Sequence, residues 1–259
     1  MKKTAIALAL LIAVVACKQN EGAPDGGAQV TTGTGTADTV SYLSPDEYLI
    51  VHIKAERASK EMAFAVGEWL DETLGGYYPG DVRDLQQMVD FYGQAMSDTL
   101  SEWAKEIGPY TYLEYDAKME KAWENDLVVT YTLETFQNMG GAHPLSGCEG
   151  VTFRKSDGRR LDWNIVSRRS NDQMKDQLRN GLKNYLEIST DDELLEILGD
   201  DKYYCLPYPQ TPPYMLENGL VFIYQQYELM AYAMGMGTDT LDYETIKPLL
   251  TCWAANLLE

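Results

Sequence analysis

Two stretches rich in β-branched and aromatic residues, separated by Asn125-Asp126, most constrain what this chain can fold into. The stretches cover residues 110–123 and 127–136. Residues of these types pack well on a pleated, half-buried surface, and Asn and Asp are typical of tight reversals. The pattern predicts an antiparallel hairpin, which a third strand near residues 150–154 follows.

Helical periodicity surrounds this hairpin. Apolar residues recur every three or four positions in four segments that we expect to be helices: residues 61–74, 81–107, 172–186 and 243–258, the last interrupted at Pro248. Thr190 with Glu193 three positions later is typical of a capping box, and it predicts a short helix ending near residue 198. We expect further strands at residues 48–54, 220–227 and 240–243, and an extended segment at 207–213.

Hairpin-like strand pairs with helices inserted between them predict the α+β class, with antiparallel sheets. The expected globular body contains two closely packed subdomains, at residues 42–120 and 121–259.

The N-terminus has the features of an exported lipoprotein. Lys2 and Lys3 precede an apolar run that is shorter than the ~20 residues needed to span a bilayer. The run ends in small residues followed by Cys17, a pattern typical of a bacterial lipobox. We therefore expect residues 1–17 to be a signal peptide and Cys17 to be lipidated. Residues 18–41, rich in Gly, Ala and Thr, are expected to be a flexible tether.

These features predict a location in the cell envelope, at the outer membrane, with the lipid as the sole membrane attachment and the leaflet left open. The formal charge is −19, and it becomes −21 once the two lysines of the signal peptide are removed. Such a chain repels nucleic acid and attracts basic partners at long range, although simple solubility is an alternative reading.

No familiar catalytic or cofactor motif is present in the sequence. It has no GxSxG, HExxH, Walker loop or GxGxxG motif, and no CxxC pair. We therefore expect neither an enzyme nor a bound cofactor or metal. Cys148, Cys205 and Cys252 allow at most one internal disulfide, and their spacing selects no pair.

Two sequence motifs resemble a known bacterial extracytoplasmic family. The first is Gly140-Gly141-Ala142-His143, followed by Val151-Thr152-Phe153 and Asp157-Gly158-Arg159-Arg160-Leu161. The second runs from Gly219 to Glu228 and continues with Ala231-Tyr232-Ala233 and Gly235. Over residues 120–255 the chain resembles the domain of unknown function 3298 (DUF3298). Residues 42–120 more weakly resemble the upstream domain of unknown function 4163, named after a peptidoglycan deacetylase, and the long helix at 81–107 departs from it.

The resemblance implies a binding role. Such relatives include the extracellular part of an anti-sigma factor that senses lysozyme by binding it, and non-catalytic regions of a peptidoglycan deacetylase. The first hypothesis is thus a non-enzymatic module that binds lysozyme or a similar basic cell-wall hydrolase. A peptidoglycan-binding or other glycan-binding module, with aromatic rings as stacking platforms, is the alternative, and a hydrolase with a carboxylate-based site is a lesser one.

The two motifs supply the candidate binding residues: Gly140, Gly141, His143, Tyr224, Gln226, Tyr227, Glu228 and Tyr232. The glycine pair predicts a tight loop with positive φ. His143 then lies either at a ligand-facing rim or at a corner that it fixes by hydrogen bonding.

Overall fold

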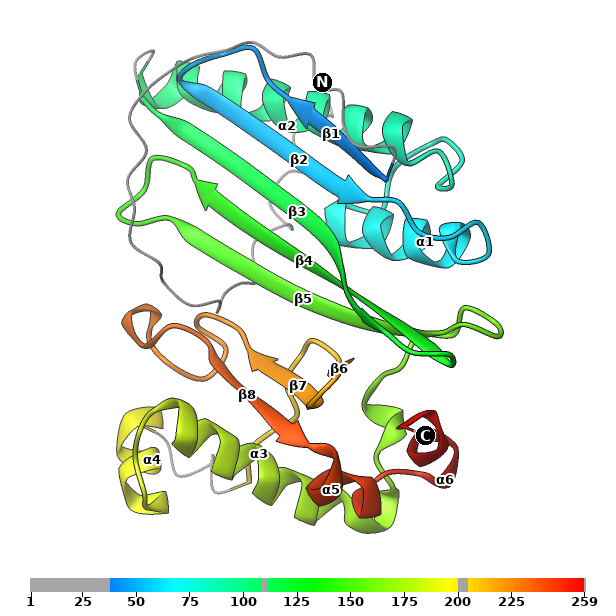
Figure 1. Ribbon diagram of the computed structural model, residues 1–259. Coiled ribbons are helices and arrows are strands. Elements are labelled where there is room, and N and C mark those ends of the chain that lie inside the picture. The colour runs from blue at the N-terminus through cyan, green and yellow to red at the C-terminus, as the bar shows by residue number, and fades with distance from the viewer. Residues whose placement is uncertain (1–37, 109–110, 200–204, 259) are drawn as a thin grey trace. The chain divides into compact units, whose positions relative to one another are not determined.

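The computed structural model of the chain describes residues 38–108, 111–199 and 205–258 (Figure 1). The expected signal peptide, the lipidation site Cys17 and residues 18–37 of the expected tether lie outside the described residues. The described chain divides into two compact units. The first unit comprises residues up to 120 together with 134–147, and the second comprises 121–133 and 148–258. The division differs from the expected 42–120 and 121–259 because residues 134–147 belong to the first unit.

A five-stranded sheet has the order β1-β2-β3-β4-β5. Its strands are β1 (Thr39–Leu43), β2 (Leu49–Glu56), β3 (Leu113–Glu124), β4 (Val128–Asn138) and β5 (Leu145–Arg154). The turn between β3 and β4 is closed by Asn125, whose side-chain oxygen accepts the backbone N–H groups of Leu127 and Val128, both at 2.8 Å. The predicted hairpin is confirmed, and the third strand begins five residues earlier than expected.

Strand β1 corrects the expected extent of the tether. It begins at Thr39, within the range 18–41 that was expected to be flexible. Thr39 to Leu43 pair antiparallel with Glu56 to His52, and Val40 is only 3% exposed. The composition of this segment is typical of a linker. It is nevertheless a strand, because it pairs with β2 and buries this valine.

One strand pair departs from the expected antiparallel pattern, because β2 and β3 are parallel. Parallel neighbours require a crossover connection. Here the connection contains α1 (Ala63–Leu74) and α2 (Leu85–Ile107), which lie on the same side of the sheet in Figure 1. Alternate residues of β2 and β3 are buried, and α2 packs on β1 and β2.

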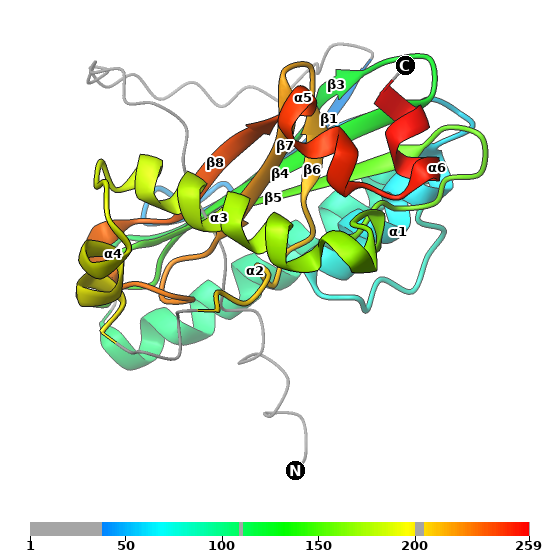
Figure 2. The same cartoon turned by 90° about the horizontal axis from the view of Figure 1, so that it is seen from below.

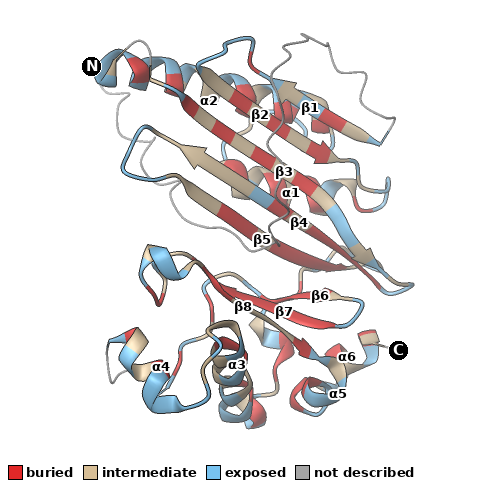
Figure 3. Cartoon of the chain, turned by 60° about the vertical axis from the view of Figure 1, so that its left-hand side comes forward, coloured by how far each residue is buried: buried red, intermediate tan, exposed pale blue. Residues whose placement is uncertain are grey.

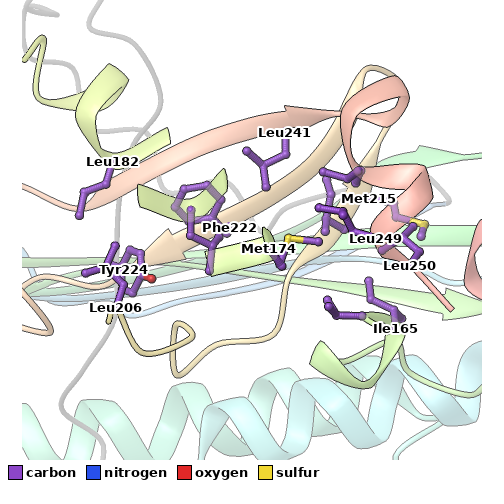
Figure 4. Packing of buried hydrophobic residues seen from close by; sticks show 14 of the residues in the cluster. Ile165, Met174, Leu182, Leu206, Met215, Phe222, Tyr224, Leu241, Leu249 and Leu250 are labelled. Atoms are coloured by element: carbon purple, nitrogen blue, oxygen red, sulfur yellow. The ribbon is translucent and has the colours of Figure 1, made fainter. Parts of the chain in front are cut away.

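The second unit contains a three-stranded antiparallel sheet of β6 (Tyr214–Leu216), β7 (Gly219–Tyr224) and β8 (Gly237–Asp242). Every residue of the central strand β7 is buried (Figure 3). Helix α3 (Asn171–Tyr185) packs along β8 (Figure 2). Figure 4 shows the core that these elements share, including Met174 and Leu182 of α3 with Phe222 of β7. The α+β class is therefore confirmed.

Short elements complete the second unit. The predicted capping box begins α4 (Asp191–Leu198): Thr190 Oγ1 accepts the Glu193 N–H at 3.2 Å, and Glu193 Oε2 accepts the Thr190 N–H at 2.9 Å. The expected C-terminal helix is instead α5 (Tyr243–Ile246) and α6 (Cys252–Ala255), joined and followed by 3₁₀ turns. The break occurs at Pro248, which cannot donate a helical hydrogen bond.

A buried hydroxyl pair attaches β6 to the ends of β4 and β5 within the second unit. Thr130 of β4 and Thr152 of β5 have their Oγ1 atoms 2.8 Å apart, and both residues are fully buried. Thr130 Oγ1 donates to the Met215 carbonyl at 2.7 Å, and Thr152 Oγ1 accepts the Met215 N–H at 2.8 Å. Two side chains thus satisfy both backbone groups of one residue, as a neighbouring strand otherwise would.

Candidate functional site

The predicted binding residues fall into both units. Gly140, Gly141 and His143 lie in the β4–β5 connection of the first unit, whereas the residues between Tyr224 and Tyr232 belong to the second unit. Each group is therefore described within its own unit.

The glycine loop is fixed against the C-terminal end of α2. Trp103 of α2 donates its indole N–H to the Met139 carbonyl at 2.9 Å, and Asn138 Oδ1 accepts the Gly140 N–H at 3.2 Å. Gly140 has a φ of +72°, and a Cβ atom there would lie 3.0 Å from Ile107 Cδ1. These contacts support a structural role for the first glycine of the pair.

His143 follows this loop on an exposed stretch of backbone. Its Nδ1 atom lies 3.2 Å from the Pro144 carbonyl oxygen. The ring thus makes a local contact at this corner while the residue is exposed.

The loop offers a matched pair of substitutions. Gly140→Ala is expected to lower the free energy of unfolding by about 1–2 kcal/mol, because an L-residue in the left-handed region is strained. Gly141→Ala is expected to be close to neutral, since a Cβ there meets nothing within 4 Å. Urea unfolding of the body from residue 38 onward checks both. Equal effects of the two substitutions would contradict this account of the loop.

In the second unit, β7 ends at Tyr224 and the chain turns sharply, so the strand expected over residues 220–227 is three residues too long. The Glu228 N–H donates to the Gln225 carbonyl at 3.0 Å, and Glu228 Oε2 accepts the Gln225 N–H at 2.8 Å. Its other oxygen accepts the Gln210 N–H at 2.8 Å. One carboxylate therefore closes the turn and ties it to the proline-rich segment.

Tyr227 occupies the tip of this turn in the left-handed region, with a φ of +65°. A bulky side chain with positive φ is strained, and such strain persists only where the surroundings hold it. The three hydrogen bonds of Glu228, one donated by its N–H and two accepted by its carboxylate, provide that hold. The Tyr227 side chain is 58% exposed, so the strained backbone presents an aromatic ring to solvent.

A second aromatic ring lies beside it. The rings of Tyr227 and Tyr232 have centroids 5.9 Å apart and are tilted by 33°. Met234 is also exposed, and its carbonyl accepts the Tyr185 hydroxyl hydrogen at 2.9 Å. We name Tyr227 and Tyr232 the Tyr227 surface; it belongs to the connection between β7 and β8 (Figure 1).

Two of the predicted binding residues hold this connection from within. Tyr224 does not reach the surface: it is fully buried, and its hydroxyl donates to the Pro207 carbonyl at 2.6 Å. Burial raises its pKa. Glu228 is half-buried, and burial raises the pKa of its carboxyl although the two N–H groups act in the opposite direction. Both residues position the turn, and Gln226 is half-buried beside them.

Sequence reasoning missed another polar pair. His52 of β2 and Asp116 of β3 face each other in the parallel register, with Nδ1 and Oδ2 2.7 Å apart. Both side chains are 37% exposed. They lie 64 positions apart in the sequence, so only a prediction of the parallel pairing could have joined them.

Glycosidases, the hydrolases that typically rely on carboxylates, use a pair of them on either side of the bond that is cleaved. Glu149 on β5 is half-buried, and burial raises the pKa of its carboxyl. Within the described ranges, no hydrogen-bond or ion-pair partner of this carboxylate is found. Glu149 is therefore an isolated acid, and it does not by itself support the hydrolase alternative.

Other chemistry-bearing groups are dispersed. Cys148 is buried, Cys205 and Cys252 are exposed, and none of the three forms a disulfide in this structure. Among residues 38–108, 111–199 and 205–258, no three His, Cys, Asp or Glu side chains come together as a possible metal site. No helix in the same ranges is both long and apolar enough to cross a membrane.

Comparison with known proteins places the fold. No protein-family model matches the sequence, and no curated protein matches it. The structure is similar to the crystal structure of a DUF3298 family member from Bacteroides fragilis NCTC 9343, with a TM-score of 0.59 and 17% identity over 85% of this chain and 96% of that one. It is also similar to a DUF3298 family protein from Pseudomonas aeruginosa PAO1, with a TM-score of 0.61 and 13% identity over 83% and 93% of the two chains.

These likenesses confirm the expected resemblance to DUF3298 proteins at the level of the fold. The protein is thus of the α+β class, with a fold similar to those two structures.

Proposed function

We propose that this chain is a non-catalytic binding protein of the cell envelope, anchored by a lipid on Cys17, that recognises a basic protein through the Tyr227 surface. The observation that carries the proposal is the exposed Tyr227 ring on a strained turn that Glu228 closes. A lysozyme or a similar basic cell-wall hydrolase is the partner that the sequence resemblance favours. An anchor at the outer membrane would place the body where such hydrolases act.

The chemistry of the turn suits a binding anchor. Tyrosine buries a large area with few rotatable bonds, and its hydroxyl retains a polar contact, so it is enriched at interface hot spots. Because the Glu228 carboxylate ties the backbone of this turn to Gln225 and to Gln210, little backbone conformational entropy is lost when a partner covers the ring. The turn therefore supports recognition through a pre-organised aromatic residue.

The charge of the chain supports a basic partner. The net charge, −19 for the full sequence and −21 once Lys2 and Lys3 are removed, creates a long-range field that steers cationic proteins towards the surface and accelerates their association. Such steering weakens with salt, whereas contacts made by a desolvated aromatic ring persist. The proposal thus predicts that one part of the binding free energy weakens with salt, because it comes from electrostatic attraction, and that another part persists, because it comes from the aromatic contact.

Replacing Tyr227 by asparagine separates the ring from the backbone. Asparagine tolerates the left-handed conformation, so Tyr227→Asn should fold as the parent protein does. Loss of the ring is expected to weaken lysozyme binding by about 2 kcal/mol, or roughly thirtyfold in Kd, in calorimetric titrations.

The matched control is Tyr48→Asn, which removes a comparably exposed ring, 51% accessible, from the first unit. It is expected to leave the lysozyme affinity unchanged. If both variants bind as tightly as the parent, the Tyr227 surface is not the binding site. If the parent does not bind lysozyme, the partner assignment fails.

A further inference from the structure

A second group of aromatic side chains lies in the first unit, apart from the Tyr227 surface. Tyr77 and Tyr78, in the loop between α1 and α2, pack against Phe91 of α2 with ring centroids 5.6 and 5.4 Å away. Tyr92 lies beneath, 5.0 Å from Tyr77 and 5.3 Å from Phe91. Tyr92 is buried, Tyr78 and Phe91 are half-buried, and Tyr77 is 49% exposed. We name Tyr77, Tyr78 and Phe91 the aromatic platform.

The loop that carries the platform is held from below. The Tyr92 hydroxyl oxygen accepts the backbone N–H of Tyr77 at 3.0 Å and that of Tyr78 at 3.2 Å, and the hydroxyl donates to Asp71 Oδ1. Burial and the hydrogen bond to Asp71 raise the pKa of Tyr92, which therefore stays protonated as a donor.

The two tyrosine rings also lie directly against glycines. A Cβ atom at Gly75 would come within 2.9 Å of Tyr77 Cδ1, and one at Gly80 within 2.5 Å of Tyr78 Cζ. Because glycine has no side chain, the two rings can pack directly against the backbone at these positions. The platform is therefore pre-organised before any ligand arrives.

Hydrogen-bonding groups border the platform. Asp71 Oδ1 accepts the Tyr78 N–H at 3.2 Å, while among the described residues Asp71 Oδ2 has no hydrogen-bond donor. Asp81 and Arg83 form an exposed ion pair, with Arg83 Nη2 2.6 Å from Asp81 Oδ2. An ionised carboxylate offers about four lone-pair sites and a guanidinium five N–H groups, so both retain capacity for a ligand.

We propose that the aromatic platform binds a neutral oligosaccharide by stacking one pyranose ring on Tyr77. A pyranose presents an apolar face of C–H groups and a rim of hydroxyls, which match an exposed aromatic ring bordered by carboxylate acceptors. The Asp71 carboxylate has no cationic partner among the described residues and repels anionic glycans, whereas the charge of Asp81 is balanced by Arg83, so the class is restricted to neutral or N-acetylated sugars. This site is separate from the one proposed for a basic protein.

A proline-rich peptide is the other class of ligand that tyrosines and acids recognise, and it requires grooves between aromatic rings. Here Tyr77 meets Phe91 and Tyr92 at interplanar angles of 64° and 76°, so these rings do not form the parallel walls of a groove. Tyr77 remains 49% exposed, which favours stacking by a flat ligand over a peptide held between two rings.

The test is a calorimetric titration of the body, from residue 38 onward, with neutral chito-, cello- and malto-oligosaccharides. We expect at least one series to bind, and Tyr77→Ala to weaken that binding about tenfold, which corresponds to the loss of one stacked ring. Tyr77→Trp should retain binding because it keeps a stacking face. Tyr48→Ala, an exposed tyrosine of the same unit outside the platform, should bind as the parent does.

Thermal unfolding of each variant shows whether Tyr77→Ala remains folded. If Tyr77→Ala is unfolded, the comparison of Tyr77→Trp with the parent protein still tests whether an aromatic ring at this position supports binding. Absence of binding in all three series would overturn the proposal, as would equal binding by the parent and a folded Tyr77→Ala. Binding of a proline-rich peptide in place of sugars would overturn the ligand class. None of these outcomes depends on lysozyme, so the two sites can fail separately.

Discussion

Replacing Gly150 by alanine is expected to destabilise the second unit by about 3 kcal/mol, the upper part of the range for inserting a methyl group into a packed core. Gly150 lies on β5 directly under the ring of Tyr214. A Cβ atom there would lie 2.5 Å from Tyr214 Cε1 and closer still to Cγ and Cδ1. The near part of a buried ring cannot move aside without displacing β6.

The surroundings of Tyr214 leave no room for relaxation. The ring is 7% exposed and packs in a small cluster with Cys148, Val221 and Ile223. Urea unfolding followed by tryptophan fluorescence measures the loss, with Gly141→Ala as the matched glycine control. The double substitution Gly150→Ala with Tyr214→Ala should show strong favourable coupling, because the added methyl group then has space. Unchanged stability in Gly150→Ala would refute this packing.

Thr152→Val is the second substitution with a large expected effect, about 1–3 kcal/mol of lost stability. Valine has nearly the shape of threonine, so no cavity forms. The Met215 N–H, however, loses the only acceptor that the described residues provide, Thr152 Oγ1 at 2.8 Å, at a position that is fully buried. An unsatisfied buried donor costs most of its desolvation free energy.

The neighbouring hydroxyl provides the control. Thr152→Ser keeps the oxygen and loses only a methyl group, so it should be clearly more stable than Thr152→Val in the same urea titration. Thr130→Val should couple with Thr152→Val, because the two hydroxyls share a hydrogen bond of 2.8 Å. Equal stabilities of the valine and serine variants would show that the hydroxyl pair does not hold β6.

Local signals predicted those parts of the fold that depend on neighbours in sequence. The β3–β4 hairpin follows from β-branched residues around Asn125, and α4 follows from the Thr190–Glu193 capping box. Pairing over long distances had no such signal. The parallel β2–β3 pair and strand β1 were missed because they are defined by contacts far apart in sequence, which order Thr39 to Leu43 against their composition.

The candidate site was predicted only in part, because it too depends on contacts that have no local signal in the sequence. The tyrosines between β7 and β8 could be selected from the sequence, but their exposure could not: extending the strand to Tyr227 left no place for the turn. Tyr224 is buried because the strand is central and covered on both faces. The platform around Tyr77 joins a loop to a helix thirteen or more positions later, which local patterns do not reveal.

The two proposed surfaces assign separate tasks to the two units. The Tyr227 surface would recognise a basic protein, and the aromatic platform would contact a neutral glycan. Both rely on tyrosine rings held by hydrogen bonds to the backbone, through Glu228 in one case and the Tyr92 hydroxyl in the other. A protein anchored by Cys17 could therefore be held near its site of action while it captures a hydrolase.

The most direct test of recognition of a basic partner is a calorimetric titration of the body from residue 38 onward with lysozyme. It is performed at low and at physiological ionic strength, with an unrelated protein of similar positive charge as control. The account predicts lysozyme binding that weakens with salt yet persists at physiological ionic strength, where the control no longer binds. Lysozyme binding that disappears together with the control would reduce the interaction to bulk electrostatics and contradict the account.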